Sequence, residues 1–307
     1  MKPELSQALD RYFGQFSSTR QLVDGLIKAK SHPQEILILL CSRIDALAST
    51  AAAEDDPRAE AFVRFVSTYS GNRKLFGSVS AGDLFYELDY HLWLMPGMLE
   101  KAGCLHVFSR LNEPVVKLLV GSEIPLTLED AQLLIRRIQR GLRKRFRVAP
   151  HQRRNKPEIG SPETIRNAII SEFSTGRAKP TSEVLKKALD PLISSKTLAR
   201  ILYEKFRCGV IHGGRVRIDE PRFFAEKSPY WAPMYSEYYG PFQFIEFPAG
   251  FLASLFSECI QHYRKRLEAT GKIPPDVHSE MFPEDPLGHL ELIDEDLLPR
   301  GRIAVPR

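Results

Sequence analysis

Residues 33–53 read PQEILILLCSRIDALASTAAA and form the most apolar of the helices that the sequence predicts. Ile36–Leu40, Ile44 and Leu47 cover more than one face of a helix with about 3.6 residues per turn. A helix of this kind is buried on several sides, so we expect it at the centre of a bundle. Asp45 lies within this apolar segment, and a buried carboxylate needs a partner.

Helical periodicity continues on both sides of this segment. The other predicted helices are Lys2–Gln15, Thr19–Ala29, Pro57–Tyr69, Ala81–Ala102, Leu128–Phe146, Glu163–Phe173, Ser182–Leu189, Ser195–Phe206 and Ala249–Ala269. Strand-like patterns at Arg215–Ile218 and Phe242–Phe247 predict one small β hairpin. The expected fold is mainly α, a helical bundle with extra helices.

Composition divides the chain into four parts. Residues 1–147 are an N-terminal helical region, 148–160 a basic linker rich in proline and asparagine, and 161–272 a C-terminal helical region. The linker ends where Ser161, Pro162 and Glu163 signal a helix start. Residues 273–307 contain six prolines and eight acidic residues, which indicates an extended arm that lies against the basic segment or a partner.

The overall composition excludes several classes of protein. With 307 residues, 43% of them hydrophobic and 26% charged, the chain has the composition of a globular protein. Its longest uncharged stretch, Phe247–Ser257, has 11 residues, whereas a membrane-spanning helix needs about 20 apolar ones. Glu4 and Asp10 interrupt the place of a secretory signal, so we expect a cytoplasmic protein with no membrane partner.

The common cofactor and metal motifs are missing from the sequence. The four cysteines are scattered and form no C-x-x-C pair, which indicates a reducing compartment and predicts neither a metal site nor a disulfide framework. No G-x-x-x-x-G-K, G-x-G-x-x-G, H-E-x-x-H or G-x-S-x-G pattern occurs. We therefore expect no cofactor. The missing motifs also argue against four classes of protein, namely nucleotide-driven motors, dehydrogenases, zincins and α/β-hydrolases.

The segment Arg136–Lys156 is strongly basic, because it contains ten Lys or Arg and no acidic residue. The net charge of the whole chain is only +5. The first half of this segment continues a helix with an apolar stripe of Leu133, Leu134, Ile138 and Leu142. Such a charge density attracts polyanions. The predicted nucleic-acid-binding residues are Arg136, Arg137, Arg140, Arg143, Lys144, Arg145 and Arg147, and the alternative is a solvated basic helix face.

An arginine and a histidine, Arg207 and His212, lie at the end of a predicted helix that Gly209, Gly213 and Gly214 loosen. In an undistorted helix their side chains point about 140° apart. They can share one phosphate only if the helix is broken or bulged near Gly209, or if a second copy of the chain completes the site. The alternative is structural, with Arg207 on helix-end carbonyls and His212 as a cap.

The motif Arg207-Cys208-Gly209-Val210-Ile211-His212 resembles the signature of the HEPN superfamily, and Ile36–Ala48 with Asp45 resembles the first core helix of such proteins. The resemblance covers about half the chain. It implies a metal-independent endoribonuclease that acts as a symmetric homodimer, in a toxin or defence setting with a cognate inhibitor protein as a further partner.

On this resemblance His212 is the general acid/base and Arg207 the phosphate clamp, while Asp45 orients one of them. Histidine moves protons near neutral pH, and arginine binds a phosphorane through two hydrogen bonds. Many active members have a polar residue where this chain has Cys208. A non-catalytic RNA-binding or dimerising module therefore stays open, as does a protein-interaction scaffold.

Five aromatic residues lie within Tyr230–Tyr239, close behind the motif. They could stack RNA bases, and Tyr235 is the candidate for this role. The alternative is that they pack a loop onto the bundle or line the dimer interface.

Overall fold

Helices dominate the protein, as the sequence predicts. The computed structural model describes residues 3–52, 55–89, 128–146, 148, 158–173, 189–208, 218–236 and 240–272. Of these residues 77% are helical, and the strands form two small antiparallel pairs. The fold is therefore mainly α. None of the helices in these ranges combines the length and apolarity that a bilayer crossing requires.

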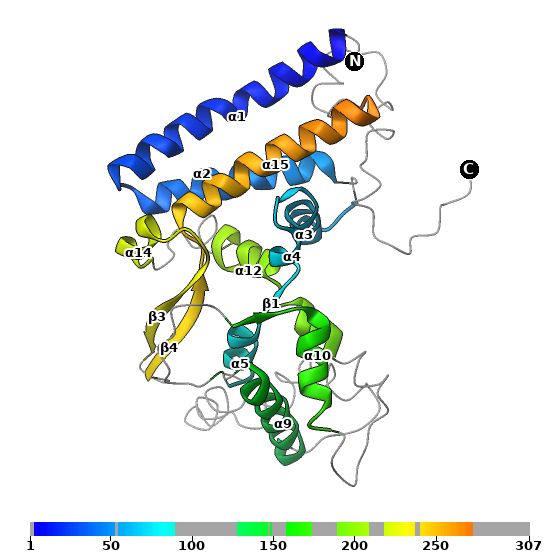
Figure 1. The fold of residues 1–307 in the computed structure, drawn as a ribbon, viewed down its shortest axis with the longest axis vertical. Coiled ribbons are helices and arrows are strands. Elements are labelled where there is room, and N and C mark those ends of the chain that lie inside the picture. Colours follow the sequence, from blue (N-terminus) through cyan, green and yellow to red (C-terminus); the bar gives the residue numbers. More distant parts are fainter. Residues whose placement is uncertain are drawn as a thin grey trace, which may run out of the picture. The chain divides into compact units, whose positions relative to one another are not determined.

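The chain divides into two compact units, each assembled from separate segments (Figure 1). Unit 1 comprises 1–76, 199–228 and 247–307, and unit 2 comprises 77–198 and 229–246. The predicted linker, 148–160, falls inside unit 2. Its last two residues are a strand rather than a connection, because Ile159 and Gly160 pair with Ser80 and Val79.

Unit 1 is built around the helix that the sequence places at its centre. Its elements are α1 (Pro3–Ala29), α2 (Pro33–Ala51), α3 (Arg58–Tyr69), α4 (Arg73–Phe76), α12 (Leu198–Ile201) from its second residue, the π-helix η3 (Leu202–Cys208), α14 (Glu220–Ala225) and α15 (Ala249–Thr270). Helix α2 contacts α1, α3, η3 and α15, and nine of its residues are buried. Figure 1 shows α15 running alongside α1 and α2.

In the core of unit 1, aromatic side chains of α1 and α3 pack against aromatic side chains of α15. Phe13 of α1 and Phe65 of α3 both lie edge-on to Tyr263 of α15, with ring centroids 6.0 and 5.6 Å apart. Phe16 meets Phe256 at 6.1 Å. The amphipathic face predicted for the closing helix is confirmed, since all its predicted residues are buried: Leu252, Leu255, Phe256, Cys259, Tyr263 and Leu267.

In the described residues, unit 2 combines helices with two strand pairs. Its elements are β1 (Val79–Ser80), α5 (Ala81–Asp89), α9 (Leu128–Phe146), β2 (Ile159–Gly160), α10 (Pro162–Ile170), β3 (Tyr230–Ser236) and β4 (Gly240–Glu246), and residues 189–194 are also helical. Helix α10 begins as predicted, because Ser161 Oγ accepts a hydrogen bond from the amide of Thr164 at 3.1 Å and Pro162 follows. Gly141 of α9 lies so close to α10 that a Cβ there would be 2.4 Å from the carbonyl oxygen of Ala168.

Several predicted elements are wrong in their bounds or type. The first two predicted helices are one continuous helix, α1, because buried Phe16, Thr19 and Val23 carry the apolar face across the expected break. The predicted helix Ser195–Phe206 is two elements, α12 and the π-helix η3. The predicted helix Ala81–Ala102 is described as far as Asp89, and most of Ser182–Leu189 lies outside the described residues.

One strand of the predicted hairpin is confirmed, since residues 242–246 lie in β4. Its partner is β3, with Trp231 opposite Ile245, while residues 215–217 of the other predicted strand lie outside the described residues. Residues 230–236 of the aromatic segment are thus a strand and not a loop. Trp231 packs on α5, where a Cβ on Gly82 would lie 2.2 Å from its ring. Pro233 is tolerated because, among the described residues, each strand of this pair has a partner on one edge only.

Candidate functional site

A buried carboxylate of unit 1, Asp45, holds two arginines. Asp45 is 2% exposed on α2, and Arg207 is 3% exposed at the end of η3. The Nη2 of Arg207 donates a hydrogen bond to Oδ2 of Asp45 at 3.0 Å. The Nε and Nη2 of Arg58, at the start of α3, donate to the same oxygen at 3.0 and 2.7 Å. We call these three residues the Asp45 centre.

Two of the predicted catalytic residues, Asp45 and Arg207, therefore meet across 162 positions of sequence. The buried acid has the basic partner that its position predicts, and a second one, Arg58, which the sequence analysis missed. Arg58 is the first residue of α3 and its side chain is 62% exposed. Oδ1 of Asp45 is buried and accepts no hydrogen bond from the part of the chain that the structure describes.

The surroundings of Arg207 keep it charged. Burial lowers the pKa of its guanidinium, but the hydrogen bond and the negative charge of Asp45 outweigh this, so its pKa is raised. The guanidinium also lies over the ring of Tyr203, 5.3 Å from the centroid, and its Nη1 is 3.9 Å from Sγ of Cys208. Burial, followed by the charge of Asp45, raises the pKa of the Cys41 thiol to about 12.

Arg207 lies on a π-helix. Residues 202–208 of η3 have the i→i+5 hydrogen-bond pattern, and α12 precedes them. Segments of this type inside α-helices occur frequently at functional sites. The described part of this distortion ends at Cys208, one residue before Gly209, near which the sequence predicts a break or bulge. His212 itself lies outside the described residues.

Six of the eight predicted nucleic-acid-binding residues lie on one helix of unit 2, α9. Its bounds agree with the prediction, and Ile135, Ile138, Leu142 and Phe146 form its buried face. Leu133, which we expected in the apolar stripe, is 52% exposed because it lies on the other side of the helix. The basic face of α9 consists of Arg136, Arg137, Arg140, Arg143, Lys144 and Arg145.

The charges of this face differ in their surroundings. Lys144 forms an ion pair with Glu172 at 2.6 Å, and Arg143 lies 5.0 Å from the ring centroid of Phe85. Arg140 and Arg145 are exposed and have no acidic partner within the described ranges. Arg147 lies outside those ranges. Tyr235 lies on β3 opposite Pro241, apart from this helix in sequence.

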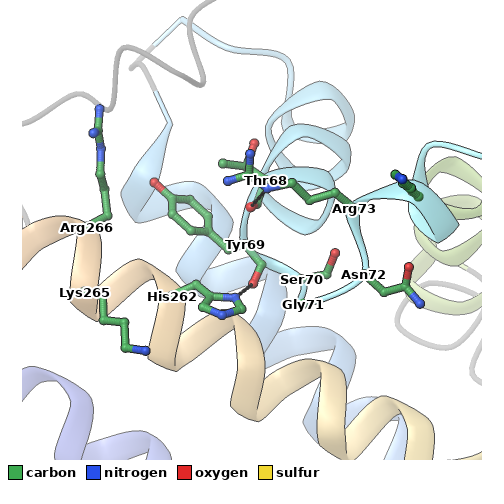
Figure 2. A pocket seen from close by; sticks show the side chains of 10 residues that line it. Thr68, Tyr69, Ser70, Gly71, Asn72, Arg73, His262, Lys265 and Arg266 are labelled. Atoms are coloured by element: carbon green, nitrogen blue, oxygen red, sulfur yellow. Dashed lines mark hydrogen bonds between the residues drawn. The ribbon is translucent and has the colours of Figure 1, made fainter.

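The structure also contains a basic pocket in unit 1 that the sequence analysis did not find (Figure 2). Its volume is about 630 Å³, and we call it the α3–α15 pocket. The end of α3 with the turn after it (residues 68–72), Arg73 and Lys74 line one side, and His262, Lys265 and Arg266 of α15 line the other. The sequence shows the basic pairs Arg73–Lys74 and Lys265–Arg266, but it does not show that they line one pocket. Tyr69 and His262, which form a hydrogen bond in the pocket lining, lie 193 positions apart.

Comparison of the chain with protein-family models, with curated protein sequences and with solved structures gives no match. Within the described ranges no group of three or more His, Cys, Asp or Glu side chains is arranged to hold a metal ion. The Asp45 centre and the basic face of α9 are therefore the candidate functional features of the described residues.

Proposed function

We propose that the protein is an endoribonuclease that cleaves RNA without a metal, with Arg207 and His212 acting on one phosphate. The observation that carries the proposal is the buried Asp45, which holds Nη2 of Arg207 at 3.0 Å on a π-helical turn. The ion pair supports the proposal because it fixes the guanidinium of Arg207 near the end of η3, five positions before His212 in the sequence.

In this proposal each residue has one task. The RNA 2′-hydroxyl attacks the adjacent phosphorus, the bond to the 5′-oxygen of the next nucleotide breaks, and a 2′,3′-cyclic phosphate forms. His212 takes the proton from the 2′-hydroxyl or supplies one to the leaving oxygen. The permanently charged Arg207 stabilises the phosphorane, and Asp45 positions its guanidinium. Because Arg207 is only 3% exposed, RNA binding must uncover it.

The test is a cleavage assay with the full chain in excess EDTA. We expect RNA products with 2′,3′-cyclic phosphate ends and no cleavage of RNA that carries a 2′-O-methyl group at the scissile nucleotide. His212→Gln and Arg207→Lys should each lower the rate by at least about 100-fold, because loss of a general acid/base costs 10²–10⁴-fold and lysine lacks the planar fork.

The control is Arg264→Gln, which removes a guanidinium of unit 1 that is paired with Asp10 and Glu268 and does not belong to the Asp45 centre. It should cleave RNA at the wild-type rate. Cleavage by His212→Gln at the wild-type rate would overturn the catalytic assignment. Thermal unfolding of each variant separates loss of catalysis from loss of the fold.

The second candidate function is nucleic-acid binding without cleavage, which the basic face of α9 favours. Arg140 and Arg145 are exposed without an acidic partner in the described ranges, so they are available for phosphate contacts. For single strands each phosphate contact contributes about 0.7 to the slope of log affinity against log salt. Arg140→Gln combined with Arg145→Gln should therefore lower that slope by about 1.4.

The control is Arg166→Gln, in the same unit, because Asp190 already neutralises Arg166 at 2.5 Å. Its salt slope should stay at the wild-type value. A slope that the α9 double variant leaves unchanged would exclude this helix as the interface. RNA binding with a normal slope and no cleavage in any condition would favour the binding module over the nuclease.

The homodimer belongs to the same proposal. In it, two copies of the chain bring their motifs together around one RNA. Light scattering after gel filtration should give twice the mass of one chain at the concentrations at which cleavage is measured. A monomer that cleaves RNA would remove the second copy from the mechanism.

A further inference from the structure

The α3–α15 pocket gathers positive charge from two elements of unit 1. Arg73 and Lys74 come from α4, and Lys265 and Arg266 come from α15 (Figure 2). No acidic residue is among its lining side chains in the described part of the chain. Lys265 is exposed and has no ion-pair partner there. The pocket is thus a concave surface with four cationic side chains.

Two of the basic groups are held in place by the end of α3. The Nε of Arg73 donates a hydrogen bond to the carbonyl oxygen of Thr68 at 2.8 Å. His262 Nδ1 lies 2.8 Å from the carbonyl oxygen of Tyr69, and because a carbonyl only accepts, Nδ1 is the donor. Both bonds satisfy carbonyls at the negative end of the helix, which reduces its repulsion of an anion.

One carboxylate, that of Glu258, contacts the turn after α3 and already accepts a hydrogen bond there. Oε2 of Glu258 accepts a hydrogen bond from the amide of Gly71 at 2.9 Å. Its negative charge offsets part of the charge of the four basic side chains that line the pocket. Ser70 lines the pocket, and its buried Oγ has no hydrogen-bond partner among the described residues. The site therefore offers donors in excess of acceptors.

We propose that the α3–α15 pocket binds the phosphate group of a phosphate monoester. Lysine and arginine are donors only, and their charge-assisted hydrogen bonds are strongest with oxyanions such as phosphate. A volume of about 630 Å³ lies within the range of small-molecule sites and leaves room for the rest of the ester. The proposal goes beyond the nuclease, because the pocket includes neither the Asp45 centre nor α9.

The phosphate could belong to a free nucleotide or to the 5′ end of an RNA. Isothermal titration calorimetry with the full chain distinguishes these sources with two pairs of probes. The first pair is adenosine 5′-monophosphate and adenosine. The second is a short 2′-O-methyl oligonucleotide with a 5′-phosphate and the same oligonucleotide with a 5′-hydroxyl.

We expect at least one phosphorylated probe to bind more tightly than its unphosphorylated counterpart. Lys74→Gln combined with Lys265→Gln should weaken that binding by at least about tenfold, since each change removes a charged donor. The control is Lys28→Gln combined with Lys227→Gln, which removes two exposed lysines of the same unit outside the pocket. Its affinity should equal that of the wild type.

The proposal is overturned if the phosphate brings no gain in affinity in either pair, or if the control weakens binding as much as the pocket variant. Binding of the nucleotide alone assigns the pocket to a small molecule, and binding of the 5′-phosphorylated oligonucleotide alone assigns it to RNA ends. Both sets of variants keep Arg207 and His212, so this result and the cleavage result are independent.

Discussion

Two arginines share one oxygen of Asp45, but they differ in how far water reaches them. Arg207 is buried and the side chain of Arg58 is 62% exposed. Breaking a buried ion pair leaves an uncompensated charge and costs about 3–5 kcal/mol, whereas an exposed pair contributes about 0–1 kcal/mol. The two arginines are therefore expected to contribute very differently to stability.

Arg207→Met should lower the free energy of unfolding by about 3 kcal/mol, and Arg58→Met by at most about 1 kcal/mol. Methionine keeps most of the side-chain volume in both variants, so the difference reports the charge. Urea unfolding followed by circular dichroism measures it. An equal loss of unfolding free energy in the two variants would show that the buried pair of Asp45 with Arg207 contributes no more to stability than the exposed pair with Arg58.

Cys41 makes the stability of the protein depend on pH in the alkaline range. Burial raises the pKa of its thiol from 9.0 to about 12. Below about pH 9 the thiol is protonated in both folded and unfolded chains. Above it the unfolded chain loses the proton while the folded chain keeps it, so stability falls by about 1.4 kcal/mol per pH unit until about pH 12.

Cys41→Ala removes this contribution. The stability difference between wild type and variant should therefore shrink by about 1–2 kcal/mol between pH 8 and pH 10. Urea unfolding at the two pH values measures the change. Leu40→Ala, a neighbouring core substitution without a titratable group, should keep the same difference from wild type at both. A Cys41→Ala difference that stays constant would contradict the burial of a protonated thiol.

At the scale of elements, two helical glycines have opposite surroundings. Gly141 of α9 lies against α10, where a Cβ would meet the carbonyl oxygen of Ala168 at 2.4 Å. Gly14 of α1 has no atom within 4 Å of an added Cβ. Glycine costs a helix interior about 0.5–1 kcal/mol relative to alanine. Of these two positions, only Gly141 requires glycine for packing.

Gly14→Ala should raise the free energy of unfolding by about 0.5–1 kcal/mol. Gly141→Ala should lower it by about 1–3 kcal/mol, because backbone of α10 must move. Differential scanning calorimetry gives both as shifts of the melting temperature in opposite directions. Destabilisation by Gly14→Ala would mean that α1 does not have this exposed face.

The elements also show which signals a sequence carries. Bounds of α9 and α15 agree with prediction to within a residue, because each has a periodic apolar face and a clear start. Strand β3 was missed because it contains Pro233 and because its three aromatics, Tyr230, Trp231 and Tyr235, do not alternate. The sequence predicts that the buried Asp45 has a partner. It does not predict that the partner is Arg207, because the two residues lie 162 positions apart and only the fold brings them together.

At the scale of the whole molecule, the chain passes four times between the two units, at 76/77, 198/199, 228/229 and 246/247. Each unit therefore depends on segments from both halves of the sequence. In unit 1, α2 packs against α15 as well as against α1 and α3. In unit 2, α9 packs against α10, which follows the predicted linker.

A chain divided at the predicted linker should not yield two folded halves. The fragment 1–147 lacks α15 and η3, so Phe13, Phe65 and Asp45 lose the partners Tyr263 and Arg207. It also lacks α10, so the buried face of α9 becomes exposed. We expect the separate fragments to give poorly dispersed ¹H–¹⁵N spectra and no cooperative unfolding.

The fragments 1–147 and 148–307 produced together should associate and recover the spectrum of the intact chain, because every described element is then present. The intact protein is the reference for both measurements. A well-dispersed spectrum from 1–147 alone would show that the helices before the linker form a stable core without α15. In that case the Asp45 centre would be an addition to a pre-existing fold rather than part of what holds unit 1 together.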